Sequence, residues 1–221
     1  GSEMCIRDRA CGGELKILIQ PLNLEDKIVY SIVENIKNRE PTKLIINCLT
    51  GSRHIDNSII HQISSYDKIK EEFIHVIDPK PRLFIVGAVH IAQALISLAK
   101  TADFEIILID PREHFATKDR FPNCKIINEW PDTALSNFIL DKATHLVTLT
   151  HDPKIDDPAL IYTLKKDIGY IGSLGSKKTH NKRCERLIDI GFCQSDLSKI
   201  HGPIGLNLSL IHISEPTRRT T

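Results

Sequence analysis

The chain has 221 residues, of which 29 are Lys or Arg and 28 are Asp or Glu, so its formal net charge is +1 at pH 7. A nearly neutral chain lacks the basic surface that a polyanion needs, and we therefore expect no nucleic acid partner. No apolar run is long enough to span a bilayer, so we expect no membrane partner. The length is sufficient for one full domain, or for one domain with part of another.

The two ends of the chain are expected to be foreign to the protein. Residues 1–9 read GSEMCIRDR and residues 208–218 read LSLIHISEPTR. A single DNA stretch encodes the first segment, and its reverse complement encodes the start of the second, which natural termini have no reason to do. We therefore interpret residues 1–9 and 208–221 as translated library adapter on a metagenomic fragment, and leave them out of the fold reasoning.

Five cysteines lie between these ends, and they are scattered, odd in number and without a CxxC pair: Cys11, Cys48, Cys124, Cys184 and Cys193. This pattern predicts neither a disulfide framework nor a zinc site. A reducing cytoplasm fits it best. Scattered cysteines are usually small buried hydrophobes, so none is assigned to a site.

The first part of the chain, in order, reads as a piece of an α/β domain. Gly12 and Gly13 predict a turn before a strand in which Leu15, Ile17 and Ile19 share one face. Further predicted elements are a helix at 24–37, a strand at 43–49 and an edge strand at 73–77, with a weak pattern between residues 50 and 70. Prolines at 79 and 81 form a stiff break, where we place a domain boundary.

From Arg82 onward, predicted strands and helices alternate. The strands are expected at 83–86, 105–110, 125–127, 145–150 and 169–171, and the helices at 90–100, 132–140, 156–166 and 177–190. This alternation is typical of an α/β, doubly wound, Rossmann-like parallel sheet with helices on both faces. We therefore expect a Rossmann-like domain at residues 79–207, preceded by a separate α/β segment at residues 10–78.

The segment IVGAVHIAQAL, residues 85–95, matches most of a dinucleotide-binding fingerprint. Gly87 follows a strand, Ala92 lies where helix should meet sheet, and Asp110 ends the next strand, where a ribose-binding acid is expected. Val89 replaces the central glycine and would crowd an approaching pyrophosphate. Three interpretations stay open: a scaffold without tight dinucleotide binding, an NAD-type site, or a site for another phosphate-bearing ligand.

Two segments follow strands and so are expected at the ligand-binding edge of the sheet. DPREHFATKDRFP, residues 110–122, carries Arg112, and the alternative to a ligand loop is a solvated loop with an Arg–Glu pair. THDPKIDDPALI, residues 150–161, carries His151 and Asp152, which could orient a substrate, relay a proton or bind a metal. Asp156 is a plausible N-cap there, and the spacing does not reveal further metal ligands.

The segment IGSLGSKKTHNKRCERL, residues 171–187, has the features of an anion cradle. Gly172, Gly175 and Ser176 precede a helix with basic residues near its start: Lys177, Lys178, Arg183 and Arg186. The alternative is a glycine turn with a Ser or Thr N-cap and a solvated basic face. The Walker spacing is absent, and IHGPIGL, residues 200–206, indicates only a rigid loop.

Taken together, these segments resemble the xanthine dehydrogenase accessory factor (XdhC/CoxI) family. The resemblance rests on GAVH (87–90), DPREHFATKDRFP, THDPKIDDPAL, GSLGSKKTHNKR (172–183) and HGPIGL (201–206), in the family's order, with CGGE (11–14) before them. It covers nearly all of residues 10–207, and it implies that residues 10–78 are the C-terminal part of a truncated N-terminal α/β domain and that residues 79–207 are a truncated Rossmann-like domain. Val89 departs from the family's glycine.

The resemblance implies a maturation factor and chaperone rather than a metabolic enzyme. Such a factor is expected to bind molybdenum cofactor, protect it during sulfuration by a cysteine desulfurase, and aid its insertion into a molybdenum hydroxylase like xanthine dehydrogenase. The phosphate tail is expected at residues 172–183, and the pterin or metal end at His151 and Asp152. The implied cofactor-binding residues are Gly87, His90, Asp110, Arg112, His151, Asp152, Gly172, Gly175, Ser176, Thr179 and Arg183.

Two other functions stay open. An NAD(P)-dependent oxidoreductase would bind its cofactor at Gly87 and Asp110, although Val89 argues against it. A docking protein that brings desulfurase and hydroxylase together would need no small-molecule site. The sequence leaves open whether the protein forms a homodimer.

Overall fold

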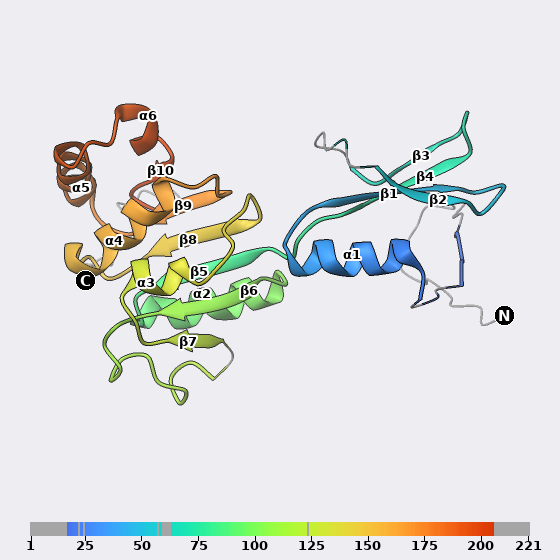
Figure 1. Ribbon diagram of the computed structural model, residues 1–221. Coiled ribbons are helices and arrows are strands. Elements are labelled where there is room, and N and C mark those ends of the chain that lie inside the picture. Colours follow the sequence, from blue (N-terminus) through green and yellow to red (C-terminus); the bar gives the residue numbers. More distant parts are fainter. Residues whose placement is uncertain are drawn as a thin grey trace, which may run out of the picture. The chain divides into compact units, whose positions relative to one another are not determined.

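The computed structural model describes residues 17–205, except 22, 24, 57, 59–62 and 123. The chain divides into two compact units between Asp78 and Pro79, and each is described by itself (Figure 1). Both suspected adapter segments, Cys11, and the turn predicted at Gly12 and Gly13 lie outside the described residues. Residues 17–21, where a strand was expected to continue, have no regular secondary structure.

The first unit is a helix beside an antiparallel sheet. Its elements are α1 (Lys27–Lys37), β1 (Thr42–Asn47), β2 (Arg53–Asp56), β3 (Ser65–Asp67) and β4 (Glu72–Ile77), and the sheet order is β2-β1-β4-β3. Asp26 caps α1, because its side chain accepts a hydrogen bond from the Ile28 N–H at 2.8 Å. Lys43 lies opposite Asp56 in the β1–β2 register and pairs with it at 2.8 Å.

Two features of this unit differ from the sequence-based expectation. Strands β2 and β3 lie where the apolar pattern weakens, because their half-exposed residues are largely polar. Strand β4 pairs with β1 on one side and with β3 on the other. The prediction of an edge strand at 73–77 is therefore wrong, and β3 takes the edge.

The second unit is a parallel sheet with helices on both faces, as predicted. It has six strands where five were predicted, because the sixth strand lies in a segment where only a rigid loop was expected, and the short helix before that strand was not predicted either. Its strands are β5 (Arg82–Val86), β6 (Glu105–Ile109), β7 (Lys125–Ile127), β8 (Thr144–Thr148), β9 (Tyr170–Ser173) and β10 (Ile200–His201), and its helices are α2 (His90–Thr101), α3 (Pro131–Ser136), α4 (Pro153–Leu164), α5 (Lys177–Asp189) and α6 (Gln194–Leu197). The order β7-β6-β5-β8-β9-β10 is that of doubly wound dinucleotide-binding sheets.

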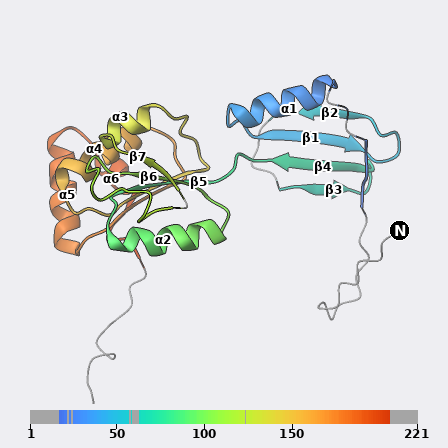
Figure 2. The same ribbon diagram turned by 90° about the horizontal axis from the view of Figure 1, so that it is seen from below.

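Alternating side chains of the central strands pack into two hydrophobic cores, one on each face of the sheet. Leu83 and Ile85 of β5 pack with α2, whereas Phe84 and Val86 pack with α3 and α4. Figure 2 shows α2 on one side of the sheet and α3 and α4 on the other. Strands buried on both faces read as continuous apolar runs, which is why the sequence pattern revealed them. No helix in the described ranges combines the length and apolar character needed to cross a membrane.

Helix α4 begins three residues earlier than predicted. Asp152, not Asp156, is its N-cap, and it accepts a hydrogen bond from the Lys154 N–H at 2.9 Å. Pro153 occupies the first helical position, where proline loses no hydrogen bond. The N-cap assignment of Asp156 was wrong, and this carboxylate is free for a different role.

The backbone at Gly87 cannot accept a side chain. Its φ is +113°, and a Cβ built there would lie 2.5 Å from Thr150 Cγ2. Gly191 also has a positive φ of +101°, but nothing lies within 4 Å of its virtual Cβ. A side chain at Gly191 would therefore suffer backbone strain alone, whereas one at Gly87 would suffer both backbone strain and steric overlap.

We expect Gly87→Ala to lower the free energy of unfolding by about 3 kcal/mol or more, because strain and overlap add. Gly191→Ala should cost about 1 kcal/mol from backbone strain alone. Urea denaturation of both variants gives the comparison. Equal losses would contradict the proposed overlap with Thr150.

Candidate functional site

The candidate site lies at the carboxyl ends of the parallel strands. Between β5 and β8 the strand order reverses, and ligands of open α/β sheets bind in the crevice at such a point. The Gly87 N–H donates to the Ile109 carbonyl at 2.9 Å, and the Leu149 N–H donates to the Val86 carbonyl at 2.8 Å. These bonds extend the ladder beyond β5 and bring the turns after β5, β6 and β8 together.

The carboxylate of Asp110 is completely buried and fully engaged. It accepts hydrogen bonds from the Ala88 N–H at 2.8 Å, from the Arg112 N–H at 2.9 Å and from the Arg112 guanidinium at 2.9 and 2.8 Å. Burial alone would raise the pKa of Asp110, but the hydrogen bonds from Arg112 and Ala88 outweigh it and lower the pKa. The acid expected to bind a ribose therefore binds its own fingerprint turn.

The guanidinium group of Arg112 has two partners within its own loop. It pairs with Asp110 and lies 4.6 Å from the centre of the Phe115 ring. The hydrogen bond to Asp110 raises the pKa of Arg112, and the charges of Asp152 and Asp156 add to this. The loop after β6 is thus partly packed and partly exposed, and Arg112 is committed to Asp110 within it.

The turn after β8 carries an unusual backbone. His151 has a φ of +63°, a left-handed conformation that is uncommon for residues other than glycine and that clusters at functional sites. Its side chain is exposed, and its Nδ1 lies 3.7 Å from where a Cβ on Gly175 would be. Asp152 is half-buried and caps α4. The turn therefore positions His151 beside the glycine turn that follows β9.

The carboxylate of Asp156 forms hydrogen bonds with this turn. This carboxylate, 1% exposed, accepts hydrogen bonds from the Thr150 hydroxyl at 2.6 Å and from the His151 N–H at 3.1 Å. It also forms an ion pair with Arg183, at 3.7 Å between Oδ2 and Nη2. Burial raises the pKa of Asp156, and the hydroxyl and Arg183 oppose that shift.

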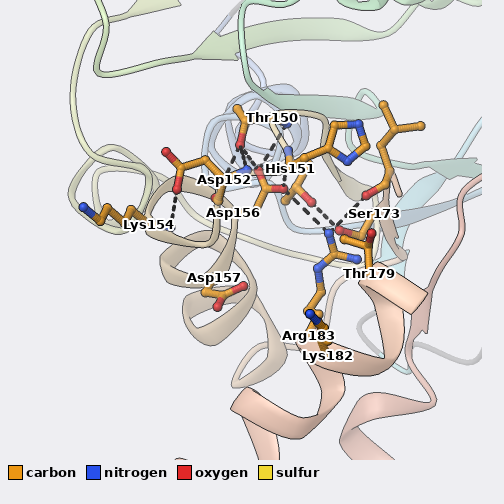
Figure 3. Close-up of polar contacts among 12 residues, drawn as sticks. Thr150, His151, Asp152, Lys154, Asp156, Asp157, Ser173, Thr179, Lys182 and Arg183 are labelled. Atoms are coloured by element: carbon orange, nitrogen blue, oxygen red, sulfur yellow. Dashed lines mark hydrogen bonds and ion pairs between the residues drawn. The ribbon is translucent and has the colours of Figure 1, made fainter. Parts of the chain in front are cut away.

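Arg183 reaches from α5 toward Asp156 (Figure 3). It is 2% exposed, and its Nη2 donates to the Leu174 carbonyl at 3.1 Å. Burial lowers the pKa of Arg183, with the charge of Asp156 acting in the opposite direction. Within the described part of the chain, its Nε and Nη1 have no hydrogen-bond partner.

A cavity of about 210 Å³ lies at this arginine, between the starts of α4 and α5. It is lined by His151, Pro153, Asp156, Lys178, Thr179, Lys182, Arg183 and Arg186. Arg186 is tied to Asp157 by two hydrogen bonds of 2.6 and 3.0 Å. The cavity therefore combines three predicted site residues, His151, Thr179 and Arg183, with a mainly cationic wall.

The other residues predicted for the anion cradle have local structural roles. Ser176 is the N-cap of α5 and accepts from the Thr179 N–H at 3.1 Å. Gly175 has a φ of +149°, and Gly172 lies inside β9, where a Cβ would be 2.5 Å from Ile204 Cδ1. Gly172 thus permits close packing within the unit. His90, which was predicted for the site through a different motif, is exposed at the start of α2.

The sequence analysis did not assign Lys182 or Asp156 to the binding site. Lys178 and Lys182, like Thr179 and Arg183, are four residues apart and so share one face of a helix. That spacing was available in the sequence. The sequence did not reveal that this face of α5 meets Asp156, because that residue lies on another helix. In the described ranges, no group of three or more His, Cys, Asp or Glu side chains could hold a metal ion.

The lowered pKa of Asp110 fixes the sign of a pH effect. An aspartate with a depressed pKa stabilises the folded state above its ordinary value of 3.8, and this stability is lost as pH falls through the depressed pKa. We expect Asp110→Asn to cost about 2–3 kcal/mol at pH 6. The difference from wild type should shrink between pH 5 and pH 3 in urea denaturation.

Asp119→Asn, on the exposed part of the same loop, is the matched control and should change stability little at any pH. Asp156 adds a pH dependence of opposite sign, but it is common to all three proteins. A difference for Asp110→Asn that stays constant with pH would contradict the assigned charge pairing.

Comparison with known proteins gives a consistent set of relatives. The chain is 30% identical over 152 residues to a probable xanthine dehydrogenase subunit of Bacillus subtilis (strain 168), covering 68% of this chain and 44% of that protein. It is 27% identical over 128 residues to the molybdenum cofactor insertion chaperone PaoD of Escherichia coli (strain K12), covering 58% and 34%. The chain thus spans less than half the length of these relatives.

The fold is similar to that of a xanthine dehydrogenase from Bacillus halodurans, with a TM-score of 0.62 and 22% identity, over 83% of this chain and 62% of that one. Residues 83–215, more than half of the chain, match the family model of the XdhC Rossmann domain. The resemblance derived from the motifs is confirmed: this chain belongs to the XdhC family.

Proposed function

We propose that the chain is the cofactor-handling part of an accessory factor that binds molybdenum cofactor and aids its insertion into a molybdenum hydroxylase. The proposal is supported by family membership and by the relative named as a molybdenum cofactor insertion chaperone. It is carried by one structural observation, the complete engagement of Asp110 within the protein.

This observation argues against the oxidoreductase alternative. A dinucleotide enzyme uses the acid after the second strand for the ribose and the N–H groups of the first turn for the pyrophosphate. Here Asp110 is 0% exposed, and the Ala88 N–H of the first turn donates to it at 2.8 Å. NAD(P) binding would break this pairing and leave Arg112 without its partner.

The residues that remain fit the two ends of the proposed cargo. Molybdenum cofactor is a pterin with a metal-binding dithiolene at one end and a phosphate at the other. The phosphate suits the cationic start of α5, where the helix dipole also favours an anion. The turn that carries His151 borders the same cavity and would contact the pterin. The molybdenum is held by the dithiolene, so the protein need not supply a full ligand set.

The proposed partners follow from the same role. A carrier would protect the oxidisable cofactor while a cysteine desulfurase sulfurates it, and would then deliver it to a hydroxylase resembling xanthine dehydrogenase. A protein that only docks these two partners would bind them without retaining cofactor. The two possibilities therefore differ in a measurable property of the isolated chain.

The test is to incubate the chain anaerobically with molybdenum cofactor and, separately, with NADH, then desalt and quantify the retained ligands. We expect molybdenum and pterin near one per chain and no nicotinamide. Retained nicotinamide without molybdenum would overturn the proposal in favour of the oxidoreductase. Absence of both, with desulfurase or hydroxylase still bound, would overturn it in favour of the docking protein.

A charge change at the N-cap of α5 tests the position of the phosphate. Asp and Asn cap helices about as well as Ser, so Ser176→Asp and Ser176→Asn both preserve the helix start. We expect the aspartate to weaken cofactor retention by on the order of 1 kcal/mol, roughly fivefold, because it places a carboxylate beside the phosphate. The asparagine variant should retain cofactor like wild type. Equal retention by both variants would remove this turn from the site.

A further inference from the structure

The cavity between α4 and α5 contains a buried cation whose hydrogen bonds are incomplete. Arg183 is 2% exposed, and of its three guanidinium nitrogens only Nη2 donates, to the Leu174 carbonyl. Nε and Nη1 lack a partner in the described part of the chain. Buried polar groups are nearly always hydrogen-bonded, so the two unpaired nitrogens indicate a missing acceptor.

Asp156 does not supply this acceptor. Its oxygen lies 3.7 Å from Arg183 Nη2, beyond hydrogen-bonding distance, and the carboxylate is already bonded to the Thr150 hydroxyl and the His151 N–H. The ion pair therefore offsets part of the charge of Arg183 and leaves Nε and Nη1 for another group.

The charges around the cavity favour a doubly charged anion. Within the described residues, no carboxylate forms an ion pair with Lys178 or Lys182, and Arg186 is matched by Asp157. Arg183, Lys178 and Lys182 against Asp156 leave an excess of two positive charges. The Thr179 hydroxyl and the positive end of the α5 dipole add to the same preference.

The size of the cavity indicates which part of a ligand it takes. Its volume of about 210 Å³ is below the roughly 300 Å³ at which pockets for whole drug-sized ligands begin. The cavity is large enough for a terminal phosphate, and it is smaller than the pockets that enclose a whole nucleotide or a whole pterin cofactor. Arginine is suited to the task, because its planar fork can bind two phosphate oxygens at once.

We propose that this cavity is a subsite for a terminal phosphate monoester, bound as a dianion by Arg183 from inside and by Lys178, Lys182 and Thr179 at the rim. The inference deepens the proposed function, on which it rests for the identity of the natural ligand. In a dinucleotide, each phosphate of the bridging pyrophosphate carries one negative charge and is substituted on two sides, so the ligand must leave the cavity in two directions. The subsite therefore selects a cofactor with a free phosphate end over a dinucleotide.

The test titrates the full chain at pH 8 and low salt with methyl phosphate, a dianion, and with dimethyl phosphate, a monoanionic diester, and follows binding by calorimetry. We expect methyl phosphate to bind at least tenfold more tightly. Lys182→Ala, on the exposed rim, should weaken methyl phosphate binding at least threefold. Lys100→Ala, at an exposed lysine of α2 that does not line the cavity, is the control and should leave binding unchanged.

Equal affinity for the two probes, no binding of methyl phosphate, or equal losses in the two lysine variants would overturn the subsite. Cofactor retention separates this failure from failure of the proposed function. A chain that retains molybdenum and pterin but does not bind methyl phosphate is a carrier without this subsite. A chain that binds methyl phosphate through Lys182 but retains no molybdenum has the subsite and serves a different phosphomonoester.

Discussion

The carboxylate of Asp156 connects the elements that form the site. An ionised carboxylate buried to this degree costs several kcal/mol unless hydrogen bonds and an opposite charge compensate it. Thr150 and His151 supply the hydrogen bonds, and Arg183 supplies the charge. The left-handed turn after β8, the first part of α4 and the inner face of α5 are therefore connected by one group.

The two halves of the sheet edge use buried carboxylates differently. After β6, Asp110 is saturated by Ala88 and Arg112, so this carboxylate is not available to a ligand. After β8, Asp156 engages only part of Arg183, so this side retains donors for a ligand. The same doubly wound order thus supports a dinucleotide site in other proteins and, as proposed here, a phosphate-terminated cargo in this one.

The sequence was sufficient for the fold of the second unit except α6 and β10, and for part of its site. Continuous apolar runs such as 83–86 identify strands buried on both faces, and the loops after them are necessarily at one edge. Strands β2 and β3 were missed because their polar residues carry no such period. The burial of Arg183 was also not predictable, because it depends on a carboxylate from another helix, and the early start of α4 freed that carboxylate from capping.

The shared use of Asp156 has a thermodynamic consequence. A group that binds Arg183 competes with Asp156 for its positive charge, and the same carboxylate restrains the His151 turn. Linkage is reciprocal. If a ligand that binds this turn changes the affinity of the cavity for an anion, then the anion changes the affinity of the turn for that ligand by the same ratio. Binding of any group at the exposed His151 turn would in this way change how tightly the cavity holds an anion.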